Sequence, residues 1–355
     1  MIIGIASADR VAPNKVNDES ERWGGSGWVR IGQYLPHLPF KVVVGSLVWK
    51  YDHLVIIDAD QAEHHPDILV LQRLMHAGLA DHIKLSRAYG QYIINDLDDW
   101  YWGLSTSNHA WKHSHPKNNP KENVNHYRSV LAASDMVTVS TSYLADRITN
   151  FVRCPITLLA NTVDISRFPI KEHSDSEQPC IGWAGSTGHR SNDIETVASV
   201  LRLMHTQHGC PLLHVGDSPN HPRFSDLISL PREEVRTISL LPFDKYPSGL
   251  TMDIGIVPLN NVPFNRAKSD IKGLEYSAAG IPFVAQNLDS YEALHRTTGA
   301  GRLAKRPKDW LSHLKMLKDP HLRRDEGLHN KEAIQSRDIS HGIKRWVDLL
   351  GSVLQ

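Results

Sequence analysis

Residues 253–285 read DIGIVPLNNVPFNRAKSDIKGLEYSAAGIPFVA, and this stretch decides the fold. It opens with an apolar run at 254–257, continues into a segment with helical spacing at 268–279, and returns to an apolar run at 283–285. Short β-rich runs on either side of a helix are typical of parallel sheets, so the pattern predicts a β-α-β unit. Because ligands of such sheets bind beyond the carboxyl ends of the strands, a site is expected at the start of this helix.

Three residues of the helical segment have the chemistry of a nucleotide site. Lys268, Lys272 and Glu275 are spaced i, i+4 and i+7, which predicts a shared helical face with Lys268 in the first turn. A lysine there can bind a diphosphate together with the helix N-terminus. An ionised glutamate can accept hydrogen bonds from two sugar hydroxyls. The alternative interpretation is a solvated Lys-Lys-Glu face.

Strands and helices alternate on both sides of this stretch. In the first half, strands are expected at residues 2–6, 41–44, 53–57, 91–94, 136–139 and 156–159, and helices at 27–38, 67–75, 122–133 and 143–151. In the second half, further strands are expected at 180–183, 212–215 and 235–240, and further helices at 193–206 and 291–296. A polar segment without apolar periodicity, residues 171–179, predicts a linker between the halves. The sequence therefore predicts an α/β protein with two doubly wound, Rossmann-like domains that face each other across a cleft.

Composition limits the class of protein. The 355 residues include 39 Lys and Arg and 39 Asp and Glu, so the formal net charge is zero, whereas a protein that coats nucleic acid normally carries excess positive charge. The three cysteines form no CxxC pair and the 21 histidines include no HExxH motif, so neither a disulfide framework nor a metal site is expected. No apolar run approaches the ~20 residues of a membrane span, and the short apolar start reads as a strand rather than a signal peptide. The protein is expected in the cytoplasm.

A glycine-rich turn follows the strand expected at 180–183. The run that starts at Ile181 reads IGWAGSTGHRSND. Its small residues allow the backbone to approach a ligand closely, and the N-terminus of the following helix suits a phosphate. The alternative interpretation is an ordinary tight turn. The candidate ligand-binding residues of this run are Gly185, Ser186, His189 and Arg190.

Residues 268–282 resemble the donor-site helix of GT-B retaining glycosyltransferases similar to family 4. Those enzymes place a glutamate just before a small-Gly-x-Pro segment, often as Lys-Ser-x-x-Lys-x-Leu-Glu-Tyr, and residues 268–276 match that pattern. Residues 155–168 resemble the family's inter-domain segment, and residues 182–186 resemble its donor-side glycine turn. Residues 24–27, GGSG, resemble the N-terminal glycine loop that faces the diphosphate. The resemblance covers most of the chain and is stronger in the C-terminal half.

Two departures from the family pattern affect the candidate site. Members often have two glutamates eight positions apart, but the first would fall at Ala267, so only Glu275 carries over. Many members also carry an Arg and a Lys after the glycine turn, where this chain has only Arg190 nearby. Lys268 is therefore expected to bind the phosphate instead.

The resemblance implies transfer of a sugar from a nucleotide-diphosphate sugar, UDP- or GDP-linked, to an acceptor hydroxyl. It further implies retention of configuration, no bound metal and no other cofactor. Lys268 is implied to stabilise the leaving diphosphate and Glu275 to hold the ribose. The implied donor-binding residues are Gly25, Gly27, Gly185, Ser186, His189, Arg190, Pro258, Asn265, Ser269 and Lys272.

The acidic segment at residues 95–102, NDLDDWYW, follows an expected strand. Asp98 and Asp99 are candidates for orienting the acceptor, because relatives carry similar segments at this position, and the adjacent aromatic side chains can stack on a sugar. An Asp-x-Asp element can also chelate a divalent metal beside a nucleotide, but that arrangement belongs to the other large glycosyltransferase fold. The alternative interpretation is loop-capping aspartates and core aromatics.

The tail from residue 309 onward reads as helical. Ile343, Trp346 and Leu350 recur at i, i+3 and i+7, so this apolar stripe needs a partner. In GT-B proteins the terminal helix commonly returns to the N-terminal domain. The expected division is therefore an acceptor-side domain at 1–168, a nucleotide-sugar domain at 169–335 and a returning helix at 336–355. The alternative is a helix that caps its own domain.

Other functions remain open on the sequence alone. One is a sugar-nucleotide-binding protein without turnover, against which the presence of both Lys268 and Glu275 argues. Another is a DNA-modifying GT-B glucosyltransferase, against which zero net charge argues. A sugar-nucleotide epimerase is a third. The sequence does not determine the oligomeric state or whether the acceptor is a glycan, a lipid, a small molecule or a protein.

Overall fold

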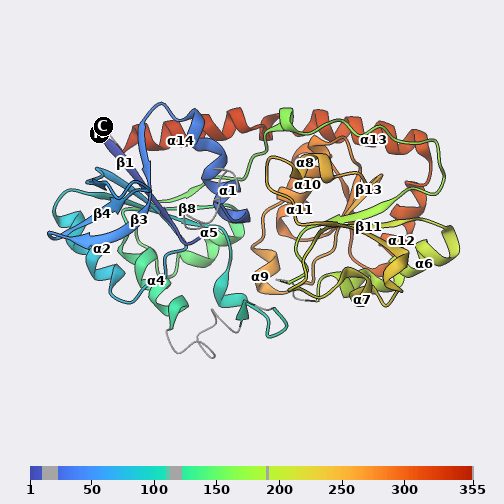
Figure 1. The fold of residues 1–355 in the computed structure, drawn as a ribbon, viewed down its shortest axis with the longest axis horizontal. Coiled ribbons are helices and arrows are strands. Elements are labelled where there is room, and N and C mark those ends of the chain that lie inside the picture. Colours follow the sequence, from blue (N-terminus) through green and yellow to red (C-terminus); the bar gives the residue numbers. More distant parts are fainter. Residues whose placement is uncertain (10–22, 109, 112–121, 189–191, 354–355) are drawn as a thin grey trace. The chain divides into compact units, whose positions relative to one another are not determined.

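The computed structural model describes residues 1–9, 23–108, 110–111, 122–188 and 192–353. The chain forms two compact units (Figure 1). Unit 1 comprises residues 1–102, 112–161 and 340–355, and unit 2 comprises residues 103–111 and 162–339. Each unit is built on a six-stranded parallel sheet, so the predicted α/β class with two Rossmann-like sheets is confirmed.

The sheet of unit 2 has the strand order β12-β11-β10-β13-β14-β15. Its strands are β10 (Ile181–Ala184), β11 (Leu212–Asp217), β12 (Val235–Ser239), β13 (Ile254–Val257), β14 (Phe283–Gln286) and β15 (Arg302–Ala304). The order reverses between β10 and β13. In doubly wound sheets such a reversal marks where ligands bind, beyond the carboxyl ends of the strands.

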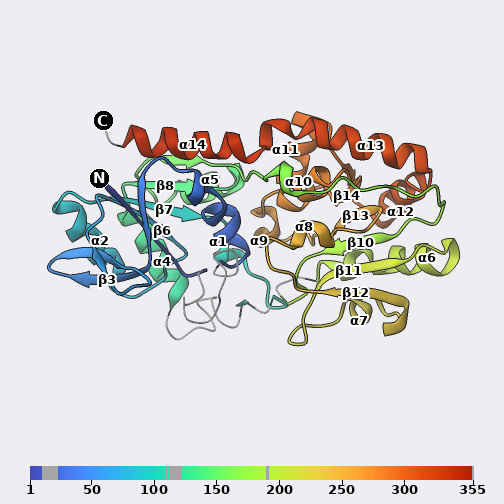
Figure 2. The ribbon, with the colours of Figure 1, turned by 45° about the horizontal axis from the view of Figure 1, so that its top comes forward.

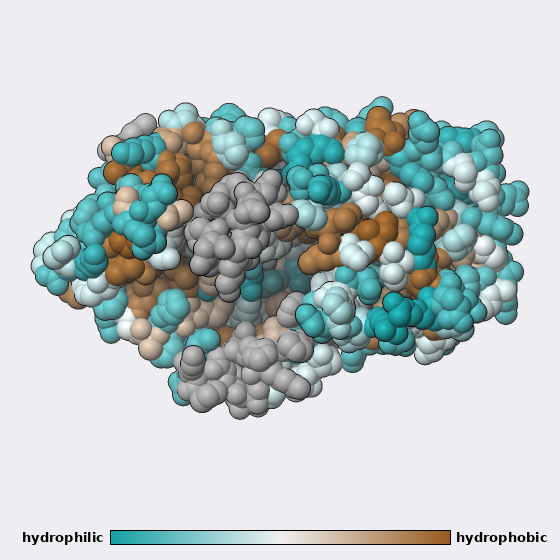
Figure 3. Space-filling model, in the orientation of Figure 1, coloured by the Kyte–Doolittle hydropathy of each residue, from teal (hydrophilic) through white to brown (hydrophobic). Residues whose placement is uncertain are grey.

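Helices cover both faces of this sheet (Figure 2). They are η5 (Ile165–Arg167), η6 (Ile194–Val197), α6 (Ala198–His208), α7 (Phe224–Ile228), η7 (Arg232–Glu234), α8 (Tyr246–Gly249), α9 (Pro263–Arg266), α10 (Ile271–Ala278), α11 (Asp289–Thr298), α12 (Pro307–Met316), α13 (Pro320–Ala333) and η8 (Gln335–Arg337). Side chains alternate along the strands. Ile181 and Trp183 of β10 belong to the apolar cluster with α6, α7 and α12, whereas Ala184 belongs to the cluster with α10 and α11. Hydrophilic side chains predominate over the edge of unit 2 that carries α6 and α12 (Figure 3).

The parallel sheet of unit 1 has the order β2-β1-β6-β7-β8-β9. A second, antiparallel sheet has the order β3-β4-β5. The strands are β1 (Ile2–Ser7), β2 (Lys41–Val44), β3 (Ser46–Lys50), β4 (His53–Ile57), β5 (Glu63–His64), β6 (Ile68–Gln72), β7 (Tyr92–Leu97), β8 (Met136–Val139) and β9 (Ile156–Leu158). The helices are α1 (Gly25–Arg30), η3 (Gly32–His37), α2 (Leu79–Ala88), η4 (Tyr101–Gly103), α4 (Asn123–Ala133), α5 (Ser142–Ile148) and α14 (Ile339–Ser352).

Two predicted elements of unit 1 differ from the structure. The helix predicted at residues 67–75 is wrong, because Ile68–Gln72 form β6, a strand between β1 and β7 in which every residue is buried. A strand buried on both faces of a parallel sheet is a continuous apolar run, which periodicity does not distinguish from a buried helix. The strand predicted at 53–57 exists as β4, but it pairs with β3 and β5 in the antiparallel sheet.

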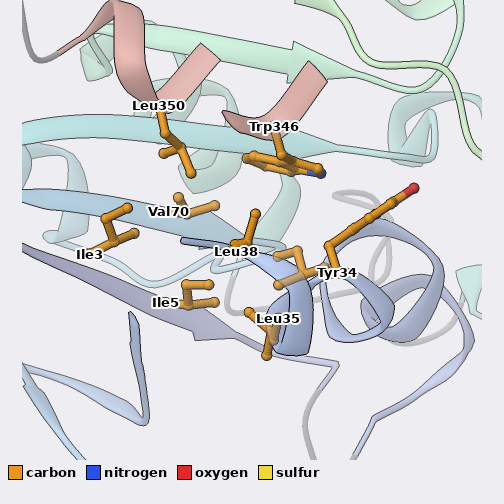
Figure 4. Close-up of a pocket in the computed structure, with 9 residues that line it drawn as sticks. Ile3, Ile5, Tyr34, Leu35, Leu38, Val70, Trp346 and Leu350 are labelled. Atoms are coloured by element: carbon orange, nitrogen blue, oxygen red, sulfur yellow. The ribbon is translucent and has the colours of Figure 1, made fainter. Parts of the chain in front are cut away.

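The terminal helix α14 packs on unit 1, although it is farthest in sequence from β1 (Figures 1 and 2). Trp346 and Leu350 are buried, and the Trp346 ring centroid lies 6.5 Å from that of Tyr34. Leu350 points toward Ile3 and Val70 of the sheet, whereas the Trp346 ring lies nearer Tyr34 and Leu38 (Figure 4), and Ile5 lines the same small cavity. The apolar stripe of the tail thus completes the core of unit 1. Ile31, Leu35 and Leu38 line the same cavity as Trp346 and Leu350.

Candidate functional site

The glycine turn after β10 lies at the reversal of strand order in unit 2. Gly185 has φ +147° and Gly216, after β11, has φ +117°, values that favour glycine. A Cβ on Gly216 would lie 2.8 Å from the Gly185 carbonyl oxygen, so the two loops approach as closely as glycine permits. The Ser186 hydroxyl pairs with His221 Nδ1 at 2.9 Å and accepts the Gly188 N–H at 3.2 Å. Gly185 and Ser186 therefore form a tightly held turn, while His189 and Arg190 lie outside the described residues.

A buried histidine that sequence reasoning missed supports this turn. His214 of β11 is buried and packs against the rings of Trp183 and Phe224, whose centroids lie 5.1 Å and 5.4 Å from its own. Its Nε2 lies 2.9 Å from the Gly185 carbonyl oxygen. The aromatic stack thus fixes the imidazole and, through it, the backbone of the glycine turn. A lone histidine inside an apolar strand gives no local signal of such a role.

The loop after β13 is joined to the segment that follows the glycine turn. The Asn265 side chain is buried and donates to Asp193 Oδ1 at 2.6 Å and to the Asn260 carbonyl at 2.9 Å. The Asn260 N–H donates to the same Asp193 oxygen at 3.0 Å. Asn265 therefore ties the two loops of the candidate site together in the structure. Pro258, another candidate, is buried at the start of this loop.

The structure corrects the position of Lys268. Helix α10 begins at Ile271, so Lys268 and Ser269 lie in the connection between α9 and α10 instead of in a first helical turn. Asp270, the residue before α10, forms a bidentate ion pair with Arg337 at 2.8 Å and ends the connection. The Lys268 ammonium lies 4.4 Å from the Phe264 ring centroid. Lys268 thus does not share a helical face with Lys272 and Glu275, which are three residues apart on α10.

Glu275 belongs to a compact polar cluster with Lys272 and Tyr246. Its Oε2 accepts hydrogen bonds from the Tyr246 hydroxyl and from Lys272 Nζ, each at 2.8 Å, and Lys272 Nζ also donates to the Tyr246 oxygen at 2.8 Å. The next residue, Tyr276, accepts the N–H of Ala184, the last residue of β10, at 3.0 Å. The cluster therefore lies on the helix that packs against the strand ends at the reversal of order. Tyr246, on α8, was not anticipated from the sequence.

In unit 1, polar residues follow the three adjacent strands β1, β6 and β7. Asp9 accepts the Gly27 N–H at 2.7 Å and pairs with Arg73 at 3.0 Å. The backbone of Arg73 has a φ of +58°, which is rare for a residue with a side chain. Residues held in such strained backbone conformations are often found at functional sites. The Gly27 N–H, a candidate for the diphosphate, is thus engaged by Asp9, while a Cβ on Gly25 would meet open space.

Asp98 and its neighbours lie at the same sheet edge. Asp98 is buried, and its Oδ1 has no hydrogen-bond partner among the described residues. Burial and the nearby Asp98 carboxylate raise the pKa of the buried Tyr101 phenol, whose hydroxyl also has no described partner. Asp99 is half-buried. Asp96, two residues before Asp98, is bound by Arg30 in the core instead of at the edge.

Among the described residues, no group of three or more His, Cys, Asp or Glu side chains gathers as a metal ion would require. No described helix is long and apolar enough to span a membrane.

Comparisons with known proteins identify the fold. No protein-family model matches the sequence, and no curated protein matches it. Among solved structures, sucrose-phosphate synthase from Thermosynechococcus elongatus is similar with a TM-score of 0.67 at 13% identity, over 99% of each chain. A glycosyltransferase from Rickettsia africae gives 0.63 at 11%, over 100% of this chain and 98% of the other. HepE of Anabaena, in complex with UDP and glucose, gives 0.61 at 12%, over 99% of each chain. The chain has the GT-B fold.

Proposed function

We propose that the chain transfers a sugar from a nucleotide-diphosphate sugar to an acceptor hydroxyl with retention of the anomeric configuration. The observation that carries this proposal is the Glu275 carboxylate, which is anchored through one oxygen beside the strand ends of unit 2. A fixed carboxylate at this place suits the two hydroxyls of a ribose. HepE, which has the same fold, has been solved with UDP-glucose, and this supports a UDP-linked donor here.

In the proposed reaction, the bond between the anomeric carbon and the diphosphate oxygen breaks, and a bond to the acceptor oxygen forms on the same face of the sugar. The acceptor proton passes to the departing diphosphate. Lys268, Ser269, Lys272 and the backbone of the turn at Gly185 stabilise the negative charge that develops on the diphosphate. Glu275 holds the ribose and thereby fixes the position of the reacting carbon.

A thermal-shift experiment with UDP, GDP and their glucose conjugates tests the donor side. A ligand present at a hundred times its Kd stabilises the folded protein by about 2.7 kcal/mol, which is a readily measured shift. Release of UDP or GDP from the bound sugar nucleotide then tests turnover. If a sugar nucleotide binds but no UDP or GDP is released, the result would instead support the alternative function, a protein that binds a sugar nucleotide without turnover. Absence of binding by all four compounds would contradict the proposal.

For the acceptor, we propose the edge of the unit 1 sheet. The unpartnered Oδ1 of Asp98 can accept a hydrogen bond from the acceptor hydroxyl. The substitution D98N should lower kcat/KM for the acceptor about tenfold or more, because a hydrogen bond to a charged group contributes about 1.5–3 kcal/mol. UDP affinity should be unchanged. D146N, at an exposed position on α5, is the matched control, and equal kinetics for both variants would remove Asp98 from the site.

We also propose that turnover needs no divalent metal, because the positive charges of Lys268 and Lys272 in unit 2 can stabilise the diphosphate in place of a cation. Addition of EDTA should leave the rate of UDP release within about twofold of the untreated enzyme, a change of less than ~0.5 kcal/mol in the barrier. If EDTA abolishes turnover and magnesium or manganese restores it, the segment at residues 96–99 becomes the first candidate for the metal site.

The three cysteines are consistent with a cytoplasmic protein, which is our proposal for its location. None forms a disulfide, and burial raises the pKa of each thiol, that of Cys180 to about 11. Cys210 is buried and Cys154 and Cys180 are half-buried, and protonated thiols that are shielded in this way react slowly and persist in a reducing compartment. Cell fractionation tests this location.

A further inference from the structure

The Glu275 carboxylate is asymmetric in its contacts. Oε2 accepts two hydrogen bonds, from the Tyr246 hydroxyl and from Lys272 Nζ, which use the two lone pairs of that oxygen. No described residue donates to Oε1, and the side chain keeps 12% of its surface exposed. Oε2 is thus bound by the protein, and Oε1 has two lone pairs that can accept hydrogen bonds from a ligand. A ribose offers two adjacent hydroxyls, which match the capacity of that single oxygen.

Tyr246 is the rigid member of the cluster. It begins the short helix α8, where its N–H donates to the Pro242 carbonyl at 2.8 Å, and its ring packs against the apolar core of unit 2. Burial and the adjacent Glu275 raise the pKa of its phenol well above the usual value, so the hydroxyl is a neutral hydrogen-bond donor at neutral pH. Lys272 Nζ lies 4.7 Å from the ring centroid, so the lysine is positioned by the same ring.

Lysine alone would hold the carboxylate less well. The Lys272 side chain is 24% exposed and carries its ammonium on a flexible four-carbon stem, whereas the Tyr246 phenol has two torsions and a half-buried ring that packs against the core. Without the Tyr246 hydroxyl, the carboxylate can rotate and exchange its oxygens between lysine and solvent. Immobilising such a side chain when the ligand binds costs affinity.

We propose that Tyr246 is a positioning residue for the nucleotide: it holds Oε2 of Glu275 so that Oε1 meets both ribose hydroxyls, and it thereby makes the site select ribose over 2′-deoxyribose. This inference rests on the proposed function. It assigns to α8, 29 residues before Glu275, a role in donor selection.

Calorimetry with UDP and 2′-deoxy-UDP on wild type, Y246F, E275Q and the double variant tests the role of Tyr246. Y246F should weaken UDP binding about three- to tenfold, the effect of one hydrogen bond, while changing 2′-deoxy-UDP binding less. In the double variant, Y246F should add nothing to the effect of E275Q, because the hydroxyl acts through the carboxylate. Y127F, which removes a phenol hydroxyl bonded to the Asp96 carbonyl in unit 1, is the control and should leave UDP binding unchanged.

E275D is the second variant, in case Y246F does not fold. It keeps the charge but withdraws the carboxylate from Tyr246, and it should also lose preference for UDP over 2′-deoxy-UDP. The inference is overturned if Y246F weakens both nucleotides equally, if its effect adds fully to that of E275Q, or if E275D keeps the full preference. If the wild-type protein binds neither UDP nor GDP, the proposed function itself is contradicted. This outcome distinguishes failure of the proposed function from failure of the inference about Tyr246.

Discussion

The substitution E275Q should weaken binding of the donor nucleotide by about 10- to 150-fold, the equivalent of 1.5–3 kcal/mol for a hydrogen bond to a charged group. Glutamine has nearly the same shape, but its side-chain amide is neutral and only one end of it can accept hydrogen bonds. The Tyr246 hydroxyl and Lys272 Nζ both donate to the carboxylate, so the amide oxygen will turn toward them and its NH2 group toward the ribose. Calorimetry with UDP and GDP measures the loss.

The fold should survive this change. Glu275 is partly exposed, and the neighbouring Tyr276 and Leu274 carry the apolar contacts of α10. E292Q, an exposed glutamate on α11 of the same unit, is the matched control and should bind nucleotide as wild type does. An E275Q protein with a normal melting temperature and unaltered affinity for both nucleotides would exclude Glu275 from the donor site.

A chain that ends at Asp338 should lose the folded state of unit 1 while unit 2 retains nucleotide binding. The deletion removes Trp346 and Leu350 from the core of unit 1. Truncating a buried tryptophan costs about 3–5 kcal/mol and a buried leucine about 2–5 kcal/mol, a sum comparable to the whole stability of a domain. Unit 2 keeps the Val163 N–H bond to the Arg337 carbonyl, at 3.0 Å, near the new end.

Limited proteolysis with mass spectrometry locates the damage, and calorimetry with UDP checks unit 2. New cleavage sites should fall between residues 1 and 161, and turnover should be abolished. The double substitution K344A/D348A removes an exposed ion pair from the opposite face of α14 and should have no effect. Full protection of unit 1 in the truncated chain would show that α14 is dispensable for its core.

The sequence predicted the strands of both sheets more accurately than it predicted where α10 begins. Strands such as β8 and β13 have the bounds expected, because a short apolar run between polar turns has few other interpretations. The assumed continuity of residues 268–279 failed, since α10 begins only at Ile271, and the residue before it, Asp270, is bound by Arg337, 67 positions away in the sequence. No local pattern encodes such a contact.

The residues that hold the candidate site in place were not predictable for the same reason. Tyr246 meets Glu275 only because α8 and α10 pack together, and His214 meets Gly185 only because β11 lies beside β10. A sequence motif can identify the side chains that contact a ligand, because ligand binding requires particular residue types at particular spacings. The residues that orient those groups have ordinary chemistry, and only the folded arrangement shows what they do.

The placement of α14 also sets an order for assembly during synthesis. The core of unit 1 contains side chains from β1 and from α14, so this unit stays incomplete until α14 has been synthesised. After residue 161 has been added, synthesis as far as Leu350 takes about 10–40 s at roughly 5–20 residues per second. Throughout that interval, Ile3, Ile5 and Val70 lack their cover, while unit 2 becomes complete as soon as residue 339 emerges. The second half of this protein therefore matures before the first, and a nascent chain needs protection of its N-terminal sheet for tens of seconds.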